Sequence, residues 1–340
     1  MARRDDSRGF RVGPTALGTT AATLLLAACG GSLGTGDGPG GGGAADTPQR
    51  LDQTNALDTA TAVVGRVLDA TALVDLVGLA LVEPVVDPDQ ALNLVNRQQA
   101  LPCDNAPDGT VTIIVDDREP NGFVSSGDGA SLQYNICLDN RLGRILSGSA
   151  DTTSIVVLDL PDDKDPKDPV PPPPWFVGVD LDLTGANLTG SRGTALLAGT
   201  VQTSQTTEQG EIFDRRVSAS QLNFGDAIGD DTLRDLQVVR ADETRIGAET
   251  YTLTLSGRLS STRLGGSFDF TTSPPLQGPI GSPPTAGTLT VTGEANTRLV
   301  ITAEPSRQGG VRLTLDDEGD GIDAQDQAGS IPSTWGALGF

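Results

Sequence analysis

Oxygen-bearing side chains recur at regular intervals in one short segment of the chain, residues 117–128. Counted from its first residue, positions 1, 3, 5, 9 and 12 are Asp117, Glu119, Asn121, Ser125 and Asp128. Gly122 stands at position 6, and the backbone carbonyl of Phe123 would supply position 7. A hard cation such as calcium takes roughly six to eight oxygen ligands. The spacing therefore predicts a calcium site.

This pattern is similar to the EF-hand calcium loop, whose ligands occupy the same positions around a glycine that makes a sharp turn. Two features depart from that loop. Asp128 is shorter than the usual glutamate at the last position, and the flanking segments are predicted strands instead of helices. An acidic hairpin loop without a metal is the alternative. If calcium binds, the expected dissociation constant is ~10⁻⁴–10⁻³ M, as in extracellular modules.

A second acidic turn near the C-terminus repeats part of the pattern. Its candidate ligands are Asp316, Glu318, Asp320 and the backbone carbonyl of Ile322. Gln327 stands where the last carboxylate would be, so this site is the weaker of the two. A solvated acidic turn is the alternative.

The N-terminal residues predict export and lipidation. Four arginines precede a short apolar run that ends in Leu26-Ala27-Ala28-Cys29. A basic head, an apolar middle and small residues before a cleavage site are typical of a secretory signal. Leu-Ala-Ala-Cys is also the lipobox pattern of bacterial lipoproteins. Residues 1–28 are therefore predicted to be a lipoprotein signal peptide and Cys29 the lipidated residue, with an ordinary cleavage near Ala28 as the alternative.

The residues after the cleavage site agree with an exported, tethered protein. Residues 29–48 are rich in glycine, which is typical of a flexible tether. Beyond them the chain has two further cysteines, Cys103 and Cys137. An even pair in an oxidising compartment predicts a disulfide, and two buried free thiols are the alternative.

Composition argues against several classes of function. The net charge of −22 repels nucleic acid. The absence of histidine removes the usual general base and the commonest transition-metal ligand. Neither a phosphate-binding P-loop nor a Gly-x-Ser-x-Gly elbow occurs. The chain is therefore predicted not to be an enzyme, and an enzyme with paired carboxylates, such as a glycosidase, is a distant alternative.

Apolar spacing predicts helices in residues 49–100. The longest apolar stretch lies within residues 57–82 and is interrupted by Arg66, Asp69 and Asp75. We expect this helix to be buried against a sheet. A membrane-spanning helix and a helix lying on a membrane or a partner are the alternatives. A shorter helix is predicted at residues 90–99.

Alternation of polar and apolar residues predicts strands throughout residues 103–340. Twelve segments qualify: 110–115, 131–137, 154–160, 176–183, 196–203, 212–222, 236–239, 250–259, 266–272, 287–292, 297–303 and 311–315. Two Pro-rich segments, 161–174 and 273–287, are predicted to be exposed loops because proline removes ladder donors. The expected fold of residues 49–340 is a single mainly β domain. It is a large antiparallel curved sheet or partial up-and-down barrel, with the N-terminal helix packed against it. Two packed sheets are the alternative.

The order of these features resembles a group of uncharacterised proteobacterial outer-membrane lipoproteins. The resemblance is carried by the lipobox, the Gly-rich tether, the N-terminal helix, and the Asp-rich loop between Cys103 and Cys137. It implies a lipid anchor in the outer membrane, facing the periplasm or the cell surface, and it implies no activity.

The expected function is that of a non-enzymatic, membrane-anchored envelope lipoprotein with a structural or binding role, stabilised by calcium. Its partner would be the membrane, through the lipid, together with an envelope protein or a hydrophobic ligand. The alternative is a carrier of lipid or another hydrophobic ligand in a half-barrel cavity, by fold analogy with periplasmic lipoprotein-carrier proteins.

Overall fold

The computed structural model describes residues 46–77, 98–103, 108–118, 124–158, 175–208, 212–245, 248–305 and 309–340. These residues belong to one compact unit. The predicted signal peptide, Cys29, most of the predicted tether and the Pro-rich segment 161–174 lie outside the described residues.

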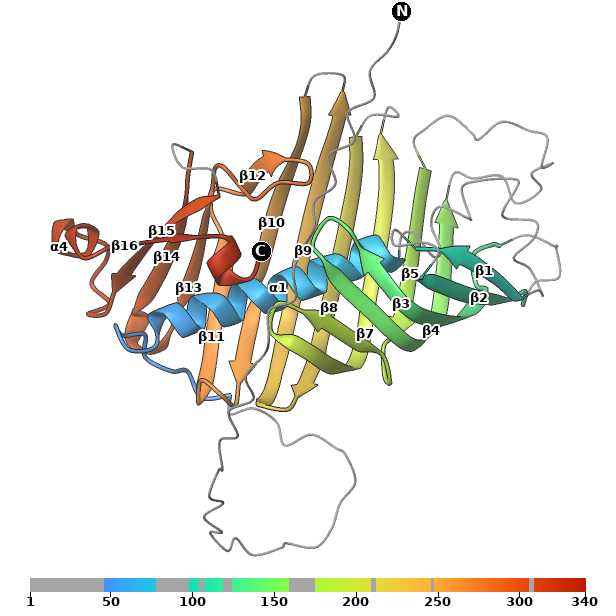
Figure 1. Cartoon of the computed structure of the whole chain (residues 1–340), viewed down its shortest axis with the longest axis horizontal. Helices are drawn as coiled ribbons and strands as arrows, with labels where there is room; N and C mark the ends of the chain where they lie inside the picture. Colours follow the sequence, from blue (N-terminus) through green and yellow to red (C-terminus); the bar gives the residue numbers. More distant parts are fainter. Residues whose placement is uncertain are drawn as a thin grey trace, which may run out of the picture. The chain divides into compact units, whose positions relative to one another are not determined.

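Most of the described residues belong to one antiparallel sheet of sixteen strands (Figure 1). The strands are β1 (Gln98–Pro102), β2 (Thr110–Asp116), β3 (Gly129–Asp139), β4 (Arg144–Leu158), β5 (Trp175–Asp182), β6 (Asn187–Gly190), β7 (Gly193–Glu208), β8 (Ile212–Asp226), β9 (Gly229–Arg245), β10 (Ala248–Ser261), β11 (Gly266–Thr272), β12 (Leu276–Pro279), β13 (Thr288–Thr292), β14 (Arg298–Glu304), β15 (Gly310–Asp316) and β16 (Ile331–Thr334).

The strands follow one another as an up-and-down meander. Neighbours in the chain are neighbours in the sheet, except that β6 pairs with β4 and β7, and β12 pairs only with β10. β1 and β16 form the two edges and do not pair with each other, so the described sheet is open. The predicted fold class, a large antiparallel curved sheet with an N-terminal helix packed against it, is confirmed.

Irregularities in the ladders occur on four of the longer strands. The register shifts between Tyr134 and Cys137 of β3, between Thr152 and Ser154 of β4, between Gly199 and Gln202 of β7, and between Ser256 and Arg258 of β10. A bulge bends its strand and increases the local twist. These shifts therefore account for the curvature that gives the sheet a concave inner face and an opposite outer face.

Helix α1 (Ala56–Val77) lies across the inner face (Figure 1). β3, β4 and the short C-terminal helix η3 (Gly336–Leu338) also contact it, so that it is enclosed on several sides. Its apolar side chains are buried almost all round, including Ala60, Val64, Leu68, Leu73 and Leu76. The predicted burial against the sheet is confirmed. No helix among the described residues combines the length and apolar character needed to cross a bilayer.

The start of α1 is fixed by a residue just upstream of it. The Asp52 carboxylate accepts hydrogen bonds from the backbone amides of Thr54 and Asn55 at 2.8 and 3.1 Å. These bonds hold the pKa of Asp52 below its ordinary value, with the Thr54 hydroxyl and amide as the main donors. The turn before the helix is thus stabilised by an ionised carboxylate.

A segment predicted as a helix and a segment predicted as a loop contain strands instead, and β6 and β16 are not among the predicted strands. β1 begins at Gln98, inside the predicted second helix, and residues 90–97 lie outside the described residues. The Pro-rich segment 273–287 contains the short strand β12. Proline is tolerated there because Pro279 stands at the last position of β12.

The predicted disulfide is present. Cys103 and Cys137 are bonded, with their Cα atoms 5.4 Å apart. Cys103 directly follows β1 and Cys137 lies in β3, so the bond ties the edge strand β1 to the strand beyond β2.

Candidate functional site

The described part of the predicted calcium loop is held by one buried carboxylate. Asp128 accepts hydrogen bonds from the Arg118 amide at 3.0 Å and from the Ser125 amide at 2.7 Å. The Ser125 hydroxyl donates to it as well, at 3.2 Å. Asp128 therefore closes the turn through the backbone. Asp117 is also described, whereas Glu119, Asn121 and Phe123 lie outside the described residues.

The second acidic turn is held in the same way. Asp316 is buried and accepts from the amides of Gly319 and Gly321 at 2.6 and 3.0 Å. Glu318 and Asp320 are exposed, and Ile322 is half-buried. Within the described residues, no cluster of three or more His, Cys, Asp or Glu side chains is arranged to hold a metal ion.

The polar groups that the fold does bring together lie between α1 and the sheet, in two clusters. We call the first the Arg66 cluster. It contains Arg66, Asp69, Arg144, Arg192, Asp226 and Asp231. Arg66 reaches from α1 to Asp226 and Asp231 at 2.7 Å each, and to Asp69 at 3.2 Å.

Two further arginines, Arg144 of β4 and Arg192 of the turn between β6 and β7, complete the Arg66 cluster. Arg144 binds Asp69 at 3.1 Å and donates to the backbone carbonyl of Gly339 at 2.7 Å, which ties the C-terminus to α1. Arg192 binds Asp231 at 2.8 Å. Three arginines thus face three aspartates, and every member is buried or nearly so.

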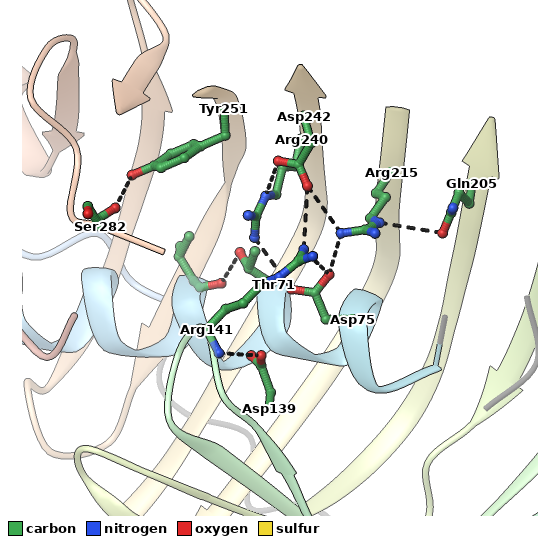
Figure 2. A network of polar contacts seen from close by, with 11 residues as sticks. Thr71, Asp75, Asp139, Arg141, Gln205, Arg215, Arg240, Asp242, Tyr251 and Ser282 are labelled. Carbon is green, nitrogen blue, oxygen red and sulfur yellow. Dashed lines mark hydrogen bonds and ion pairs between the residues drawn. The ribbon is translucent and has the colours of Figure 1, made fainter. Parts of the chain in front are cut away.

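The second cluster, the Asp75 cluster, lies further along α1 (Figure 2). It contains Asp75, Arg141, Arg215, Arg240 and Asp242. Arg215 bridges Asp75 at 2.8 Å and Asp242 at 3.1 Å, and Arg240 binds Asp242 at 2.7 Å. Arg141 comes from the turn between β3 and β4 and approaches both carboxylates at 3.4 Å. The cluster therefore joins α1, β8, β9 and that turn.

Electrostatics favour the ionised form of the Arg66–Asp231 pair. Burial alone would raise the pKa of Asp231. The charge of Arg66, a hydrogen bond from Ser261, the charge of Arg192 and the hydrogen bond from Arg66 outweigh burial and lower the pKa. Burial likewise opposes the charge of Arg66, but its carboxylate partners raise the pKa. Burial lowers the pKa of Arg192, although the charge of Asp231 opposes that change.

The space beside the Asp75 cluster is small. A cavity lined by Arg240, Tyr251 and Phe340 has a volume of about 20 Å³, which is room for about one water molecule. Asp75 and Asp242 share Arg215 and Arg240 as ion-pair partners. A cavity of this size does not admit a sugar ring or an acyl chain.

Only part of each cluster has a signal in the sequence. Arg66 and Asp69 are three residues apart, which places them on neighbouring positions of a helix. Their partners on the sheet follow 75 to 165 residues later in the chain. Only the sheet register brings them under the helix, and no local pattern contains that information.

A larger hollow lies on the outer face of the sheet. Its volume is about 410 Å³, and its lining comes from β4, β5, β7, β8 and β9. The lining residues that project to this face include Val156, Phe176, Asp180, Gln202, Arg216 and Gln237. They alternate with inner-face residues such as Val177, Arg215 and Val238.

Comparison with other proteins provides no relative. No protein-family model matches the chain, and neither the curated proteins nor the solved structures include a significant match.

Proposed function

We propose that this protein is a non-enzymatic, lipid-anchored lipoprotein of the bacterial envelope, whose β domain is a rigid scaffold with a binding role. One observation carries the binding role. The inner face is filled by a helix that a buried and a partly buried cluster of ion pairs hold in place, while the outer face has a hollow of about 410 Å³. Small-molecule sites commonly measure about 300–1,000 Å³. The outer surface is therefore the better place for a ligand.

The anchor can be tested separately from the binding role. Cys29→Ser should release the protein from the membrane fraction, because the substitution removes the sulfur that carries the acyl chains. The measurement is membrane fractionation with radiolabelled palmitate in a Gram-negative host. Cys103→Ser is the control, since it removes a cysteine outside the lipobox and should leave labelling unchanged. Labelled, membrane-bound Cys29→Ser protein would contradict the proposed anchor.

Calcium is proposed as a stabilising ion of the loop at residues 117–128. Millimolar calcium should raise the melting temperature of the wild type, and Asp117→Asn should abolish that rise because it removes a ligand charge. Asp116→Asn is the matched control, since Asp116 lies outside the ligand pattern and its side chain is exposed. For each protein, the quantity compared is the rise in melting temperature on adding calcium. A substitution that only lowers stability does not change this rise. Equal melting temperatures of the wild type with calcium and with chelator would refute the role.

The carrier function is a second candidate because a helix lies across the concave face of an open sheet, the arrangement expected of a lid. It requires α1 to leave the sheet, since the cavity beside the Asp75 cluster is about 20 Å³. Purified protein extracted with organic solvent should then yield a stoichiometric lipid. The scaffold proposal predicts none.

A further inference from the structure

The floor of the outer hollow is made of small residues. Gly178 of β5 pairs with Val156 of β4 and with Ser204 of β7. Ser204 pairs in turn with Arg216 of β8. Paired residues of an antiparallel ladder project to the same face. Glycine and serine therefore leave a depression between the larger side chains around them.

An aromatic ring lies against this floor. A Cβ atom placed on Gly178 would approach Cε1 and Cζ of Phe176 to 2.9 and 3.0 Å. The ring therefore occupies the space that any other residue at position 178 would need. Phe176 is half-buried, and Val156 beside it is 38% exposed. Together they provide an apolar surface at one end of the hollow.

Planar polar groups border the rest of the hollow. Asp180 and Gln202 are paired across β5 and β7, and Gln237 pairs with Ser218 on the next strands. Gln202, Gln237 and Arg216 are exposed. An amide both donates and accepts, a carboxylate accepts, and a guanidinium donates in a fixed fork. The rim therefore offers donors and acceptors in nearly equal measure.

The charges exclude a strongly ionic ligand. Within the described residues Arg216 forms no ion pair, but Asp180 lines the same hollow. Asp214 precedes Arg216 by two residues on β8, so the two share a strand face. An anion would meet these carboxylates and the net charge of −22, and a cation would meet Arg216. A neutral ligand rich in hydroxyl groups avoids both penalties.

We propose that the outer hollow binds a neutral oligosaccharide. The apolar face of a sugar ring would lie on Phe176 and Val156, and its hydroxyl groups would bond to Asp180, Gln202, Arg216 and Gln237. This inference deepens the proposed binding role and assigns its ligand class. The anchor does not depend on it, because palmitate labelling of Cys29 reports on the anchor alone.

The experiment is isothermal titration of the purified mature protein in detergent with cellotetraose, maltotetraose and chitotetraose. We expect at least one of them to bind, and Phe176→Ala to weaken that binding at least about tenfold. Gly178→Ala should weaken it too, because the added Cβ displaces the ring without removing it. Gln202→Ala with Gln237→Ala tests the polar rim at exposed positions where folding is not at risk.

Ile114→Ala is the matched control, because Ile114 is an exposed apolar residue of β2, outside the hollow. It should leave the dissociation constant unchanged. The proposal is overturned if none of the three sugars binds at millimolar concentration. It is also overturned if folded Phe176→Ala protein binds as the wild type does, or if only the anionic polymer polygalacturonate binds.

Discussion

Replacing Arg66 by methionine should lower the free energy of unfolding by about 3–5 kcal/mol, the cost of removing one partner from a buried ion pair. The Arg66 side chain is 1% exposed and contacts three carboxylates. Asp69 would keep its ion pair with Arg144, and Asp231 would keep its ion pair with Arg192. Asp226 would lose its ion pair with Arg66. The cation–π contact of Arg66 with Phe224, at 4.8 Å, would also be lost. Chemical denaturation of both proteins measures the difference.

Arg258→Met is the matched control. Arg258 forms a two-contact ion pair with Asp269 at 2.7 and 3.0 Å, but both side chains are well exposed. An exposed pair contributes no more than about 1 kcal/mol. Adding Asp226→Asn to Arg66→Met should restore part of the lost stability, because it removes an uncompensated buried charge. Equal effects of Arg66→Met and Arg258→Met would contradict the structural role of the cluster.

The pH dependence of the free energy of unfolding provides a second measurement on Arg66→Met and the wild type. Because the folded-state pKa of Asp231 is below its ordinary value of 3.8, its contribution is fully present above that pH. The contribution is lost as the pH falls through the lower folded-state pKa. In Arg66→Met the largest cause of the lowering is absent, so stability should fall less steeply in acid than in the wild type.

Removing the disulfide should have the next largest effect. The bond spans 34 residues of sequence, and the loop-entropy relation gives roughly 3.5–4 kcal/mol for its loss. Cys103→Ala with Cys137→Ala should therefore unfold at a clearly lower denaturant concentration under oxidising conditions. Wild-type protein treated with reductant should approach the double variant, while the variant itself should not respond. A reductant-sensitive variant would show that the effect does not come from this bond.

Much of the architecture could be predicted because it depends on local patterns. β2 and β11 alternate buried and exposed residues, and the open meander follows from strands that succeed one another without intervening helices. The β4 strand begins at Arg144, ten residues before its predicted start. The first half of β4 is missing from the prediction because it is rich in Ser, Gly and Asp, which are not typical of strands. The predicted helix at residues 90–99 wrongly includes Gln98, because the pairing of Gln98 with Ile114 of β2 is a contact between separate segments that no local pattern contains.

The sites were harder to predict for a physical reason. Arg66, Asp69 and Asp75 stand out in the sequence as charges in an apolar helix. Their partners are set by the register of distant strands. The outer hollow could not be predicted from the sequence for the same reason, because Gly178, Ser204 and Arg216 are neighbours only through the pairing of β5, β7 and β8. The predicted calcium ligands Glu119, Asn121 and Phe123 lie outside the described residues, so that site stays a prediction.

We infer that α1 is a permanent part of the core and not a lid. Hydrogen–deuterium exchange of the purified protein is the sharpest test, because amides that open separately exchange at a lower free energy than those that require global unfolding. We predict that the amides of α1 exchange as slowly as those of β8 and β9, and that Arg66→Met accelerates all three together. Faster exchange of α1 while β8 and β9 stay protected would contradict the claim and would favour a helix that opens to admit a ligand.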